Sequence, residues 1–418
     1  MSDAPRSRWP FVLAMAGVAA WVTFVALIAR MYAQSPPGAG FDLELLLTGG
    51  RRVAAGLSPY ETSMLAGESV GITTLFYSYP PLVAQAFAPF AAVPSVVMLA
   101  TLLIVSPLAA AAVSASIARL SSIRLSERQA FLAVLATLPF WFPFTLAALF
   151  GNLDLLFVAF YGILLLAVLP AAPSRGALIG AGVAVAVATL TKLHPAVLGV
   201  WLLARGVREW RRGDARVTLV GAALPRSWAI AAVAALVGVL AIAVSLLVGG
   251  VGPWADYVTV LRASTVVDLL DPRNLGPAVQ IALALGLDQS AIAPMQSVVV
   301  VLALVVAVAA ALAVDDPLES VLWAASASLV VLPVTWFHHF AVLVPFGVAA
   351  LARGWDGRPE ARRQMLALTI FAFLVAGVLF ARTMAWLLVL IAFVLVRLSR
   401  PASPAPDQAV ASTVAPAA

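Results

Sequence analysis

The residues of this chain that could do acid–base chemistry are few, and they stand beside long apolar segments. Asp42 and Glu44 follow the first of these segments, and the single lysine of the chain, Lys192, lies two residues before His194. The two remaining histidines, His338 and His339, are adjacent. A carboxylate can take a proton from an incoming hydroxyl, and cations can hold a phosphate and offset the negative charge that grows on it. Together these residue types suit transfer from a phosphate ester, with Asp42 as the leading candidate for the general base.

Other kinds of chemistry are excluded or disfavoured by the same sequence. It contains no cysteine, which excludes thiol catalysis, disulfides and cysteine-bound metals. No Gly-x-x-x-x-Gly-Lys-Ser/Thr loop occurs, so the sequence does not support a P-loop site for nucleotide hydrolysis. Adjacent His338 and His339 point in different directions on a helix, so we expect at most one to face a given site. A two-histidine metal site would want i, i+4 spacing. We therefore predict no bound metal and no other cofactor.

The composition indicates which elements must hold these residues. Of the 418 residues, 63% are hydrophobic and 11% are charged, and the mean hydropathy is +1.04. A soluble chain is about half apolar and about a quarter charged. The first apolar run, residues 10–32, is long for a signal peptide and lacks a clear cleavage site, so we interpret it as a retained helix. We predict an all-α polytopic membrane protein, a bundle of about 12 transmembrane helices.

The arginines set the predicted topology. Residues 80–93 lie between prolines and are too few for the ~20 residues that span a membrane, so we interpret them as a re-entrant or interfacial helix. Both termini are then cytoplasmic, and most of the basic residues lie inside, as the positive-inside rule expects. The net charge of +6 therefore reflects topology rather than nucleic-acid binding. The predicted spans are residues 10–32, 94–119, 127–148, 151–169, 175–192, 195–205, 228–249, 294–314, 318–335, 339–352, 364–381 and 383–397.

Two outer loops and a tail complete this organisation, in which residues 1–400 form a single integral-membrane domain. The first outer loop, residues 33–93, contains a segment 42–55 with helical spacing of its leucines and of Ala54. We expect an amphipathic helix there that lies on the membrane and ends at Gly56. The second large outer loop is residues 250–293. Residues 401–418, rich in Pro, Ala and Ser, are expected to be a disordered cytoplasmic tail.

This topology brings five polar clusters to the outer face. They are Asp42/Glu44, residues 151–154 with Asn152 and Asp154, residues 192–195 with Lys192 and His194, the loop 254–288, and residues 336–339. Polar residues at helix ends in such an apolar chain are costly and are candidates for function. Each also has a structural alternative: a solvated surface acid for Asp42 or Glu44, a helix-dipole partner for Asp154, and a side chain that reaches the interface for Lys192.

A series of motifs occurs in a fixed order between about residues 40 and 345. They are Asp42, Gly56-x-x-Pro59-Tyr60, Tyr79-Pro80-Pro81, Gly151-Asn152, Lys192-Leu193-His194-Pro195, Trp254-x-x-Tyr257, Asn274-Leu275-Gly276 and Pro333-x-x-Trp336-x-His338-His339. This order resembles the family 87 glycosyltransferases, polytopic GT-C enzymes typified by polyprenol-phosphate-mannose-dependent α-1,2-mannosyltransferases. The resemblance implies metal-independent, inverting transfer of a hexose from a polyprenyl-phosphate donor. The acceptor would be a lipid-linked or glycan hydroxyl on the outer face of the cell membrane.

The resemblance also implies roles for individual residues. A carboxylate in the first outer loop is the general base of such enzymes, and this position falls on Asp42. The contacts that it implies for the donor phosphate are Lys192, His194, Trp336, His338 and His339. We expect further substrate contacts from Tyr60, Tyr79, Asn152, Asp154 and Asn274.

Three departures from the family pattern leave the sugar and the acceptor open. Members usually have Gly-Gln where this chain has Gly151-Asn152, often Asn-Gln-Ser at residues 274–276, and many carry a tyrosine shortly after the aspartate. An arabinofuranosyl or other pentosyl transferase is therefore an alternative. A lipid-linked sugar transporter or flippase is another, although the polar groups gather on one face and no inverted repeat is found. A structural or assembly partner fits the ordered polar motifs less well.

Overall fold

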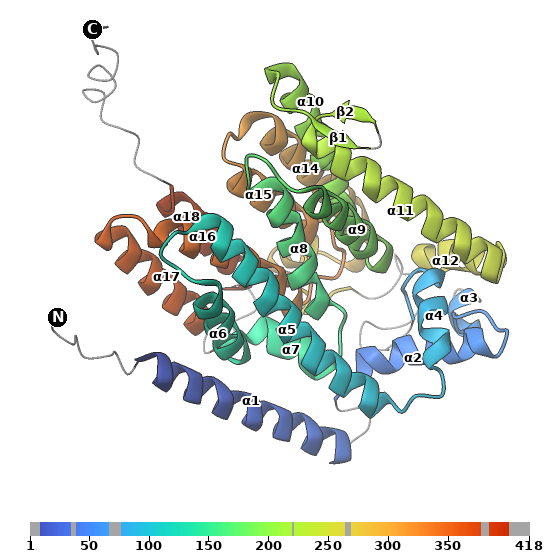
Figure 1. Cartoon of the computed structure of the whole chain (residues 1–418). Helices are drawn as coiled ribbons and strands as arrows, with labels where there is room; N and C mark the ends of the chain where they lie inside the picture. Colours follow the sequence, from blue (N-terminus) through green and yellow to red (C-terminus); the bar gives the residue numbers. More distant parts are fainter. Residues whose placement is uncertain are drawn as a thin grey trace, which may run out of the picture.

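A computed structural model describes residues 9–34, 39–66, 77–219, 221–263, 269–377 and 384–400. The predicted tail 401–418 lies outside these residues. The described chain is predominantly helical, as the sequence predicts (Figure 1). Its α-helices are α1 (Trp9–Gln34), α2 (Phe41–Ala54), α3 (Thr62–Leu65), α4 (Pro81–Phe87), α5 (Ser95–Ser121), α6 (Glu127–Thr137), α7 (Phe142–Phe150), α8 (Asp154–Val168), α9 (Arg175–Thr191), α10 (Ala196–Arg212), α11 (Arg226–Gly249), α12 (Gly252–Ala263), α13 (Pro277–Leu285), α14 (Ile292–Ala313), α15 (Pro317–Val330), α16 (Val344–Trp355), α17 (Pro359–Gly377) and α18 (Ala385–Leu398). Short 3₁₀ helices are η1 (Ala88–Phe90), η2 (Leu138–Phe140), η3 (Gln289–Ala291) and η4 (Phe337–Leu343).

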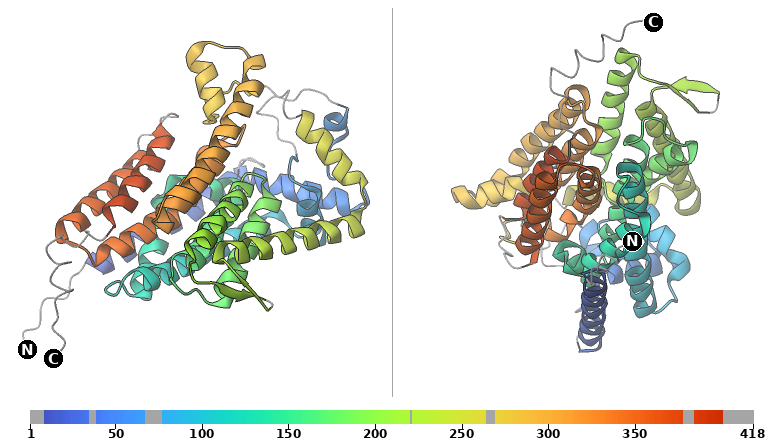
Figure 2. Two further views of the ribbon diagram at one scale, coloured as in Figure 1. Left: turned by 90° about the horizontal axis from the view of Figure 1, so that it is seen from above. Right: turned by 60° about the vertical axis from the view of Figure 1, so that its left-hand side comes forward.

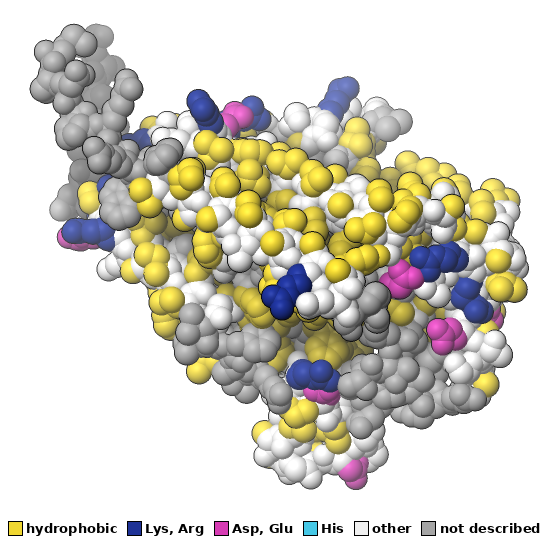
Figure 3. All heavy atoms as spheres, turned by 90° about the horizontal axis from the view of Figure 1, so that it is seen from below, with side chains coloured by type: hydrophobic (Ala, Val, Ile, Leu, Met, Phe, Trp, Pro, Cys, Tyr) yellow, Lys and Arg dark blue, Asp and Glu magenta, His cyan; other side chains and the backbone are white. Residues whose placement is uncertain are grey.

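Several of these helices can cross a membrane. Five stretches of the described chain are long and apolar enough, namely Ala14–Gln34, Ser95–Ser121, Arg226–Gly249, Gln289–Ala313 and Phe337–Trp355. Shorter apolar helices, such as α8, α9, α15 and α18, accompany them. Hydrophobic side chains cover much of the surface in Figure 3, and on α11 the side chains of Val239 and Leu247 are 64% and 86% exposed. Apolar surface of this extent requires lipid around it, so the chain is a multi-pass membrane protein.

The span predicted over residues 127–148 is not one straight helix, because this segment is broken into two helices that together are apolar and long enough to cross a membrane. Helix α6 continues into η2, and α7 then leaves at an angle of 71°. Trp141, between them, has an extended backbone, with φ −85° and ψ 91°. Pro139 lies in η2 and Pro143 in the first turn of α7. Proline lacks the N–H group of a helix interior and clashes with the preceding turn, so two prolines four residues apart end one helix and start the next.

Helix α8 lies at the centre of the main hydrophobic core. Its buried side chains include Phe157 and Tyr161, and it packs against α5, α9 and η4. A helix that is apolar on all sides is surrounded either by lipid or by other helices, and α8 is surrounded by helices. The same core contains Trp201 of α10, Phe340 of η4 and Phe346 of α16. The N-terminus of this central helix, at Asp154, is therefore held between several elements at once.

The described residues of the predicted first outer loop form a small unit at one end of the bundle, where α2, α3, α4 and α12 lie together (Figure 1). The predicted amphipathic helix is confirmed as α2, which buries Leu43, Leu46 and Leu47. Ala54, expected on the buried face, is exposed because it lies in the last turn, beyond the packing surface. Gly56 follows with φ +73°, a conformation that favours glycine. The apolar helical stretch Pro81–Phe90 is only about 15 Å long at 1.5 Å per residue, which agrees with a segment too short to span.

The opposite end of the bundle is tied by polar contacts. Ser122, after α5, donates its hydroxyl hydrogen bond to Asp356, after α16, at 2.9 Å. Arg353 of α16 makes two 2.9 Å hydrogen bonds to Asp316, which precedes α15.

Between α10 and α11 the antiparallel strands β1 (Val217–Leu219) and β2 (Ala222–Leu224) pair with Thr218 opposite Ala223. This hairpin is an exception to the all-α prediction. Helix α13 and the adjoining start of α14 project from the bundle (Figure 2), around a separate apolar cluster of their own.

The two ends of α5 provide a direct test of topology. We expect Ala92→Cys to react with a membrane-impermeant maleimide added to intact cells, and Ile123→Cys to react only after the membrane is opened. Both positions are exposed in the structure, and α5 between them has the length and hydropathy of a spanning helix. The chain has no native cysteine to interfere. The reverse labelling pattern would place the first outer loop in the cytoplasm and contradict the predicted orientation.

Candidate active site

Asp42 and Asn152 come from two distant parts of the chain and are joined by a hydrogen bond. The amide Nδ2 of Asn152 donates to Asp42 Oδ2 at 2.6 Å. The preceding Gly151 has φ +65°, and a Cβ atom there would lie 2.8 Å from Cβ of Leu43. Only glycine allows this backbone conformation and this approach together. The turn after α7 therefore lets the start of α2 come close enough for Asp42 to reach Asn152.

A buried ion pair lies directly beyond Asn152. The Nζ atom of Lys192 is 2.7 Å from Oδ1 of Asp154, and the two side chains are only 13% and 1% exposed. Lys192 also donates to Oδ1 of Asn152 at 3.1 Å, and the backbone N–H of Asp154 donates to the same oxygen at 2.9 Å. Asn152 thus connects the charge pair with Asp42. An ion pair of this burial is costly to form unless its partners are held in place, and four polar groups hold each other here.

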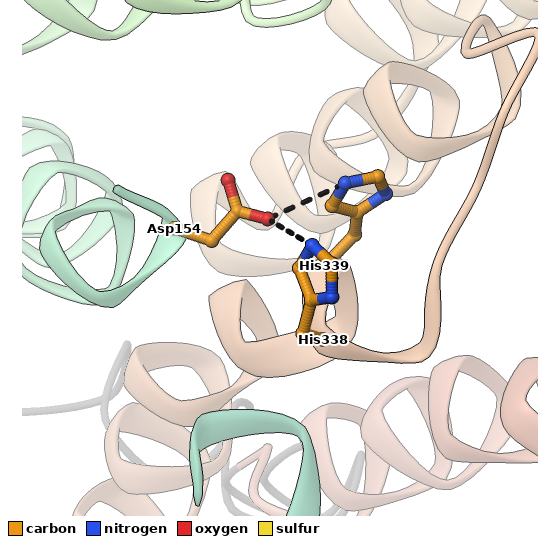
Figure 4. Close-up of side chains that lie close together, drawn as sticks. All are labelled: Asp154, His338 and His339. Atoms are coloured by element: carbon orange, nitrogen blue, oxygen red, sulfur yellow. Dashed lines mark ion pairs between the residues drawn. The ribbon is translucent and has the colours of Figure 1, made fainter. Parts of the chain in front are cut away.

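Both histidines of the adjacent pair face this ion pair, contrary to the prediction that at most one would. The Nε2 atoms of His338 and His339 each lie 3.4 Å from Oδ2 of Asp154 (Figure 4). Their rings are 4.6 Å apart and inclined at 79°. The Cβ atoms of adjacent residues on a helix do point in different directions. Imidazole rings extend well beyond Cβ, and here their rotamers bring both rings to one carboxylate at the start of η4.

The backbone before η4 orients one of these rings. The backbone N–H of Trp336 donates to Nδ1 of His339 at 3.1 Å. In neutral imidazole one ring nitrogen accepts and the other carries the proton, so this contact assigns the proton to Nε2, which faces Asp154. His338 Nε2 lies 3.3 Å from the Asn152 amide. His194 completes the cluster, with its ring centroid 6.2 Å from that of His339.

Tyr79 lies near Asp42, and a second tyrosine of the predicted first outer loop, Tyr60, contacts it. The hydroxyl of Tyr60 donates to the backbone oxygen of Tyr79 at 2.9 Å, and the Tyr60 ring stacks on Tyr257 of α12 at 6.1 Å. Burial, and after it the negative charges of Asp42 and Asp154, raise the pKa of the Tyr79 phenol. Tyr79 therefore lies within the field of both carboxylates, as a neutral hydrogen-bonding group. Tyr60 is fully buried and uses its hydroxyl to hold Tyr79 in place.

Asn274, expected to contact substrate, has its side chain occupied by the backbone. Its Oδ1 accepts from the N–H groups of Gly276 and Thr335, both at 2.9 Å. Its Nδ2 donates to the backbone oxygen of Pro333 at 3.0 Å. These bonds fix the segment that leads into Trp336 and the two histidines. The geometry favours a positioning role, and a direct substrate contact remains a prediction.

The rival carboxylate, Glu44, is engaged elsewhere. It forms an ion pair of 2.6 Å with Arg51, and the side chains of Arg51 and Glu44 are 42% and 38% exposed. Two residues along a helix correspond to a rotation of about 200°, which separates Glu44 from Asp42 as the sequence predicts. The neighbouring Arg52 was missed by the sequence reasoning. It donates to the backbone oxygens of Ser58 and Tyr60 at 2.7 Å each. An arginine pair in a predicted outer loop departs from the positive-inside rule, and this departure is the signal that could have revealed it.

The pKa of the Asp42 carboxyl is raised towards neutral pH. Asp42 lies in α2, outside the candidate membrane spans. Burial raises its pKa to about 6, although the hydrogen bond from Asn152 and the charge of Lys192 lower it, and the charge of Asp154 raises it. A general base works best when its pKa lies near the operating pH. At neutral pH this carboxyl is mostly ionised but more basic than an ordinary aspartate.

We expect the activity of the protein to fall at acidic pH through this group. Only the ionised carboxylate accepts a proton, so kcat/KM should rise as the pH passes through about 6 and level off above it. Asn152→Ala removes a hydrogen bond that lowers the pKa of Asp42 and should shift this limb to higher pH. The Glu44→Gln protein serves as the control and should keep the wild-type profile. A profile that is flat between about pH 5 and 8 would contradict the assignment.

The same cluster has a donor set that could hold a metal ion. Asp154, His338 and His339 each offer a ligand atom, and these atoms lie within 4.8 Å of one another. Two imidazoles and a carboxylate are ligands that zinc accepts. Lys192, however, already places an ammonium group 2.7 Å from the same carboxylate. A divalent ion would have to bind beside this positive charge, so the arrangement favours Lys192 as the resident cation.

Comparison with known proteins gives one match. The family model described as Glycosyltransferase family 87 matches residues 77–337. The matched region includes Tyr79, Asn152, Asp154, Lys192 and Trp336, whereas Asp42 precedes it and the histidine pair follows directly after its end. No curated protein and no solved structure matches the chain.

Proposed function

The chain belongs to glycosyltransferase family 87 and is thus a membrane glycosyltransferase, and we propose that it transfers a hexose, namely mannose, from a polyprenyl-phosphate donor. The acceptor is the hydroxyl of a lipid-linked or glycan substrate. The observation that carries this proposal is the chain of contacts from Asp42 through Asn152 to the Lys192–Asp154 pair and the two histidines. These contacts support the proposal because Asp42, the proposed base, is then close to an ammonium group and two imidazoles, which are groups able to bind a phosphate.

Lys192 has the capacity to bind the donor phosphate. An ammonium group has three N–H donors, of which Asp154 and Asn152 receive two. The third is free to reach a phosphate oxygen without loss of the buried pair. Nε2 of His339 carries a proton next to the same carboxylate, so it provides a second donor on this side of the site. The leaving phosphate gains negative charge as its bond to the sugar breaks, and fixed donors stabilise that charge.

Asp42 then acts on the acceptor. The acceptor oxygen attacks the anomeric carbon while the bond from that carbon to the phosphate oxygen breaks. The hydroxyl proton passes to the Asp42 carboxylate, and polyprenyl phosphate leaves. A single displacement of this kind inverts the anomeric configuration. Asn152 holds the carboxylate by the oxygen Oδ2, which leaves Oδ1 to meet the incoming hydroxyl.

We assign the site to the outer face of the cell membrane, with both ends of the chain in the cytoplasm. A site on the outer face has no supply of nucleotide sugars, so its sugar donor has to be carried on a membrane lipid. The proposed twelve spans each overlap a helix in the described residues, several of them shorter than an isolated spanning helix. Short helices such as α8 and α15 are buried among their neighbours, which is compatible with spans inside a bundle.

The reaction is proposed to be metal-independent, because the lysine ammonium stands where a metal would neutralise the carboxylate. The test is removal of divalent ions. Transfer should be unchanged when a strong chelator is present and when Mg²⁺, Mn²⁺ or Zn²⁺ is then restored. Loss of activity in chelator, with recovery in one of these ions, would instead assign Asp154, His338 and His339 as metal ligands.

The function is tested by incubating the purified protein with synthetic polyprenyl-phosphate sugars and an alkyl glycoside acceptor, followed by mass analysis of the product. We expect transfer from polyprenyl-phosphate mannose, none from nucleotide sugars, and an inverted anomeric configuration in the product. Transfer from the arabinofuranosyl donor alone would assign a pentosyl transferase. Movement of labelled donor across proteoliposomes without any transfer would favour a flippase and contradict the proposal.

A further inference from the structure

A cavity of about 380 Å³ lies at the C-terminal end of α2, the opposite end of this helix from Asp42, and is not used by the proposed mechanism. It is open on one side and is lined by the C-terminal turn of α2, the loop that follows Gly56, the start of α4 and the junction of α11 with α12. Its polar side chains are Ser58, Gln85 and Asp256. Three prolines and several aliphatic residues form the remainder of its wall.

The polar side chains are held in place. Ser58 donates its hydroxyl to Oδ2 of Asp256 at 2.6 Å, and Gln85 donates to the backbone oxygen of Ser245 at 3.1 Å. Arg52 fixes the backbone at Ser58. Oδ1 of Asp256 and the remaining amide atoms of Gln85 are then left to meet a ligand, with acceptors and a donor on neighbouring walls.

The charge of the cavity indicates what it can bind. Its lining contains one carboxylate and no lysine or arginine, so a phosphate would be repelled rather than held. A neutral polyhydroxyl ligand fits better, because carboxylate and amide groups accept and donate hydrogen bonds to hydroxyls. The apolar wall suits the C–H faces of sugar rings. The donor phosphate and the occupant of this cavity are therefore different chemical groups.

The position of the cavity relates it to the acceptor. Val53 of α2 lines it, and Asp42 lies in the first turn of the same helix. Eleven residues at 1.5 Å per residue place them about 16 Å apart along the helix axis, a length of a few sugar units. We propose that this cavity binds sugar units of a neutral acceptor glycan that precede the reacting one. This inference rests on the proposed function and gives the enzyme a preference for acceptors longer than one sugar.

The first test changes the cavity and measures the acceptor. Gly252 lines the cavity and a Cβ atom there meets nothing within 4 Å, so Gly252→Leu adds a large side chain at the cavity wall without a clash at its Cβ atom. Asp256→Ala removes the carboxylate. Each substitution should raise KM for a mannotriose glycoside about tenfold, because that change corresponds to the loss of one charge-assisted hydrogen bond or its equivalent. KM for a single-sugar acceptor should stay unchanged. Gly238→Leu, on α11 away from the cavity and equally unobstructed, is the matched control. Equal effects on short and long acceptors would overturn the proposal.

The second test measures binding without catalysis. Leu57 lines the cavity and is 56% exposed, so Leu57→Cys introduces the only thiol of the chain. We expect mannotriose glycoside to slow its reaction with maleimide at least threefold, and to lose this effect when Gly252→Leu is added. Protection in a protein that transfers no sugar would support the cavity and refute the proposed function. Active transfer without protection, or protection by polyprenyl monophosphate instead, would overturn the cavity assignment.

Discussion

Asp42→Asn is expected to lower the rate of sugar transfer about 100-fold or more, which is the lower range for the loss of a general base. The amide keeps the size and shape of the carboxylate but cannot accept the hydroxyl proton. The variant should fold, because Asp42 lies on the half-buried start of α2 and its main partner is a single side chain, Asn152. Donor binding should persist, because Lys192 and the histidines are untouched.

The matched control for this substitution is Glu44→Gln. Glu44 lies in the same helical turn and its ion pair with Arg51 is solvated on both sides. Exposed pairs contribute about 0–1 kcal/mol, so Glu44→Gln should change neither stability nor rate by much. Steady-state rates with saturating donor distinguish the two variants. Near wild-type transfer by Asp42→Asn would show that another group takes the proton.

Lys192→Met is expected to damage both the stability and the donor use of the protein. It leaves the carboxylate of Asp154, 1% exposed, without its partner at 2.7 Å. Removing one member of a buried pair costs about 3–5 kcal/mol. Loss of a charge-assisted hydrogen bond to the donor phosphate costs about 1.5–3 kcal/mol, so kcat/KM for donor should fall about ten- to hundredfold. Thermal unfolding in detergent and donor titrations measure the two effects.

A double variant separates the two roles of Lys192. Lys192→Met combined with Asp154→Leu replaces the buried charges by apolar side chains, which is often neutral or stabilising. We expect it to regain stability and to remain defective in donor use. Arg273→Met is the control, because Arg273 is 54% exposed and its ion pair with Asp271 at 2.6 Å lies in the predicted second outer loop. If the double variant recovers full donor use, Lys192 serves the fold alone.

His338→Ala and His339→Ala extend this test to the rest of the cluster. Each removes one ring that lies 3.4 Å from Asp154. We expect weaker donor use in both, with the larger loss for His339, whose Nε2 proton is fixed by the contact between Trp336 and Nδ1. Donor dependence that is unchanged in both variants and in Lys192→Met would return these residues to purely structural roles.

The sequence by itself determined the class of the protein and which residues belong to its candidate site. Apolar segments of spanning length and arginines at helix ends follow from the cost of placing charge in lipid, a local property that needs no knowledge of packing. They were enough to predict that the clusters around Asp42, Asp154, Lys192 and His338 would meet. The helical period was enough to separate Asp42 from Glu44.

The tertiary structure alone decided how these residues are connected. Asn152 bonds to Asp42 across 110 residues, because Gly151 permits a close approach that no local pattern encodes. The rotamers of both histidines bring their rings to the carboxylate of Asp154. The side-chain amide of Asn274 forms hydrogen bonds with backbone groups. The cavity of Ser58, Gln85 and Asp256 arises where three segments meet. Periodicity and charge act within one segment, whereas hydrogen bonds and cavities depend on the distances between segments, and only packing sets those distances.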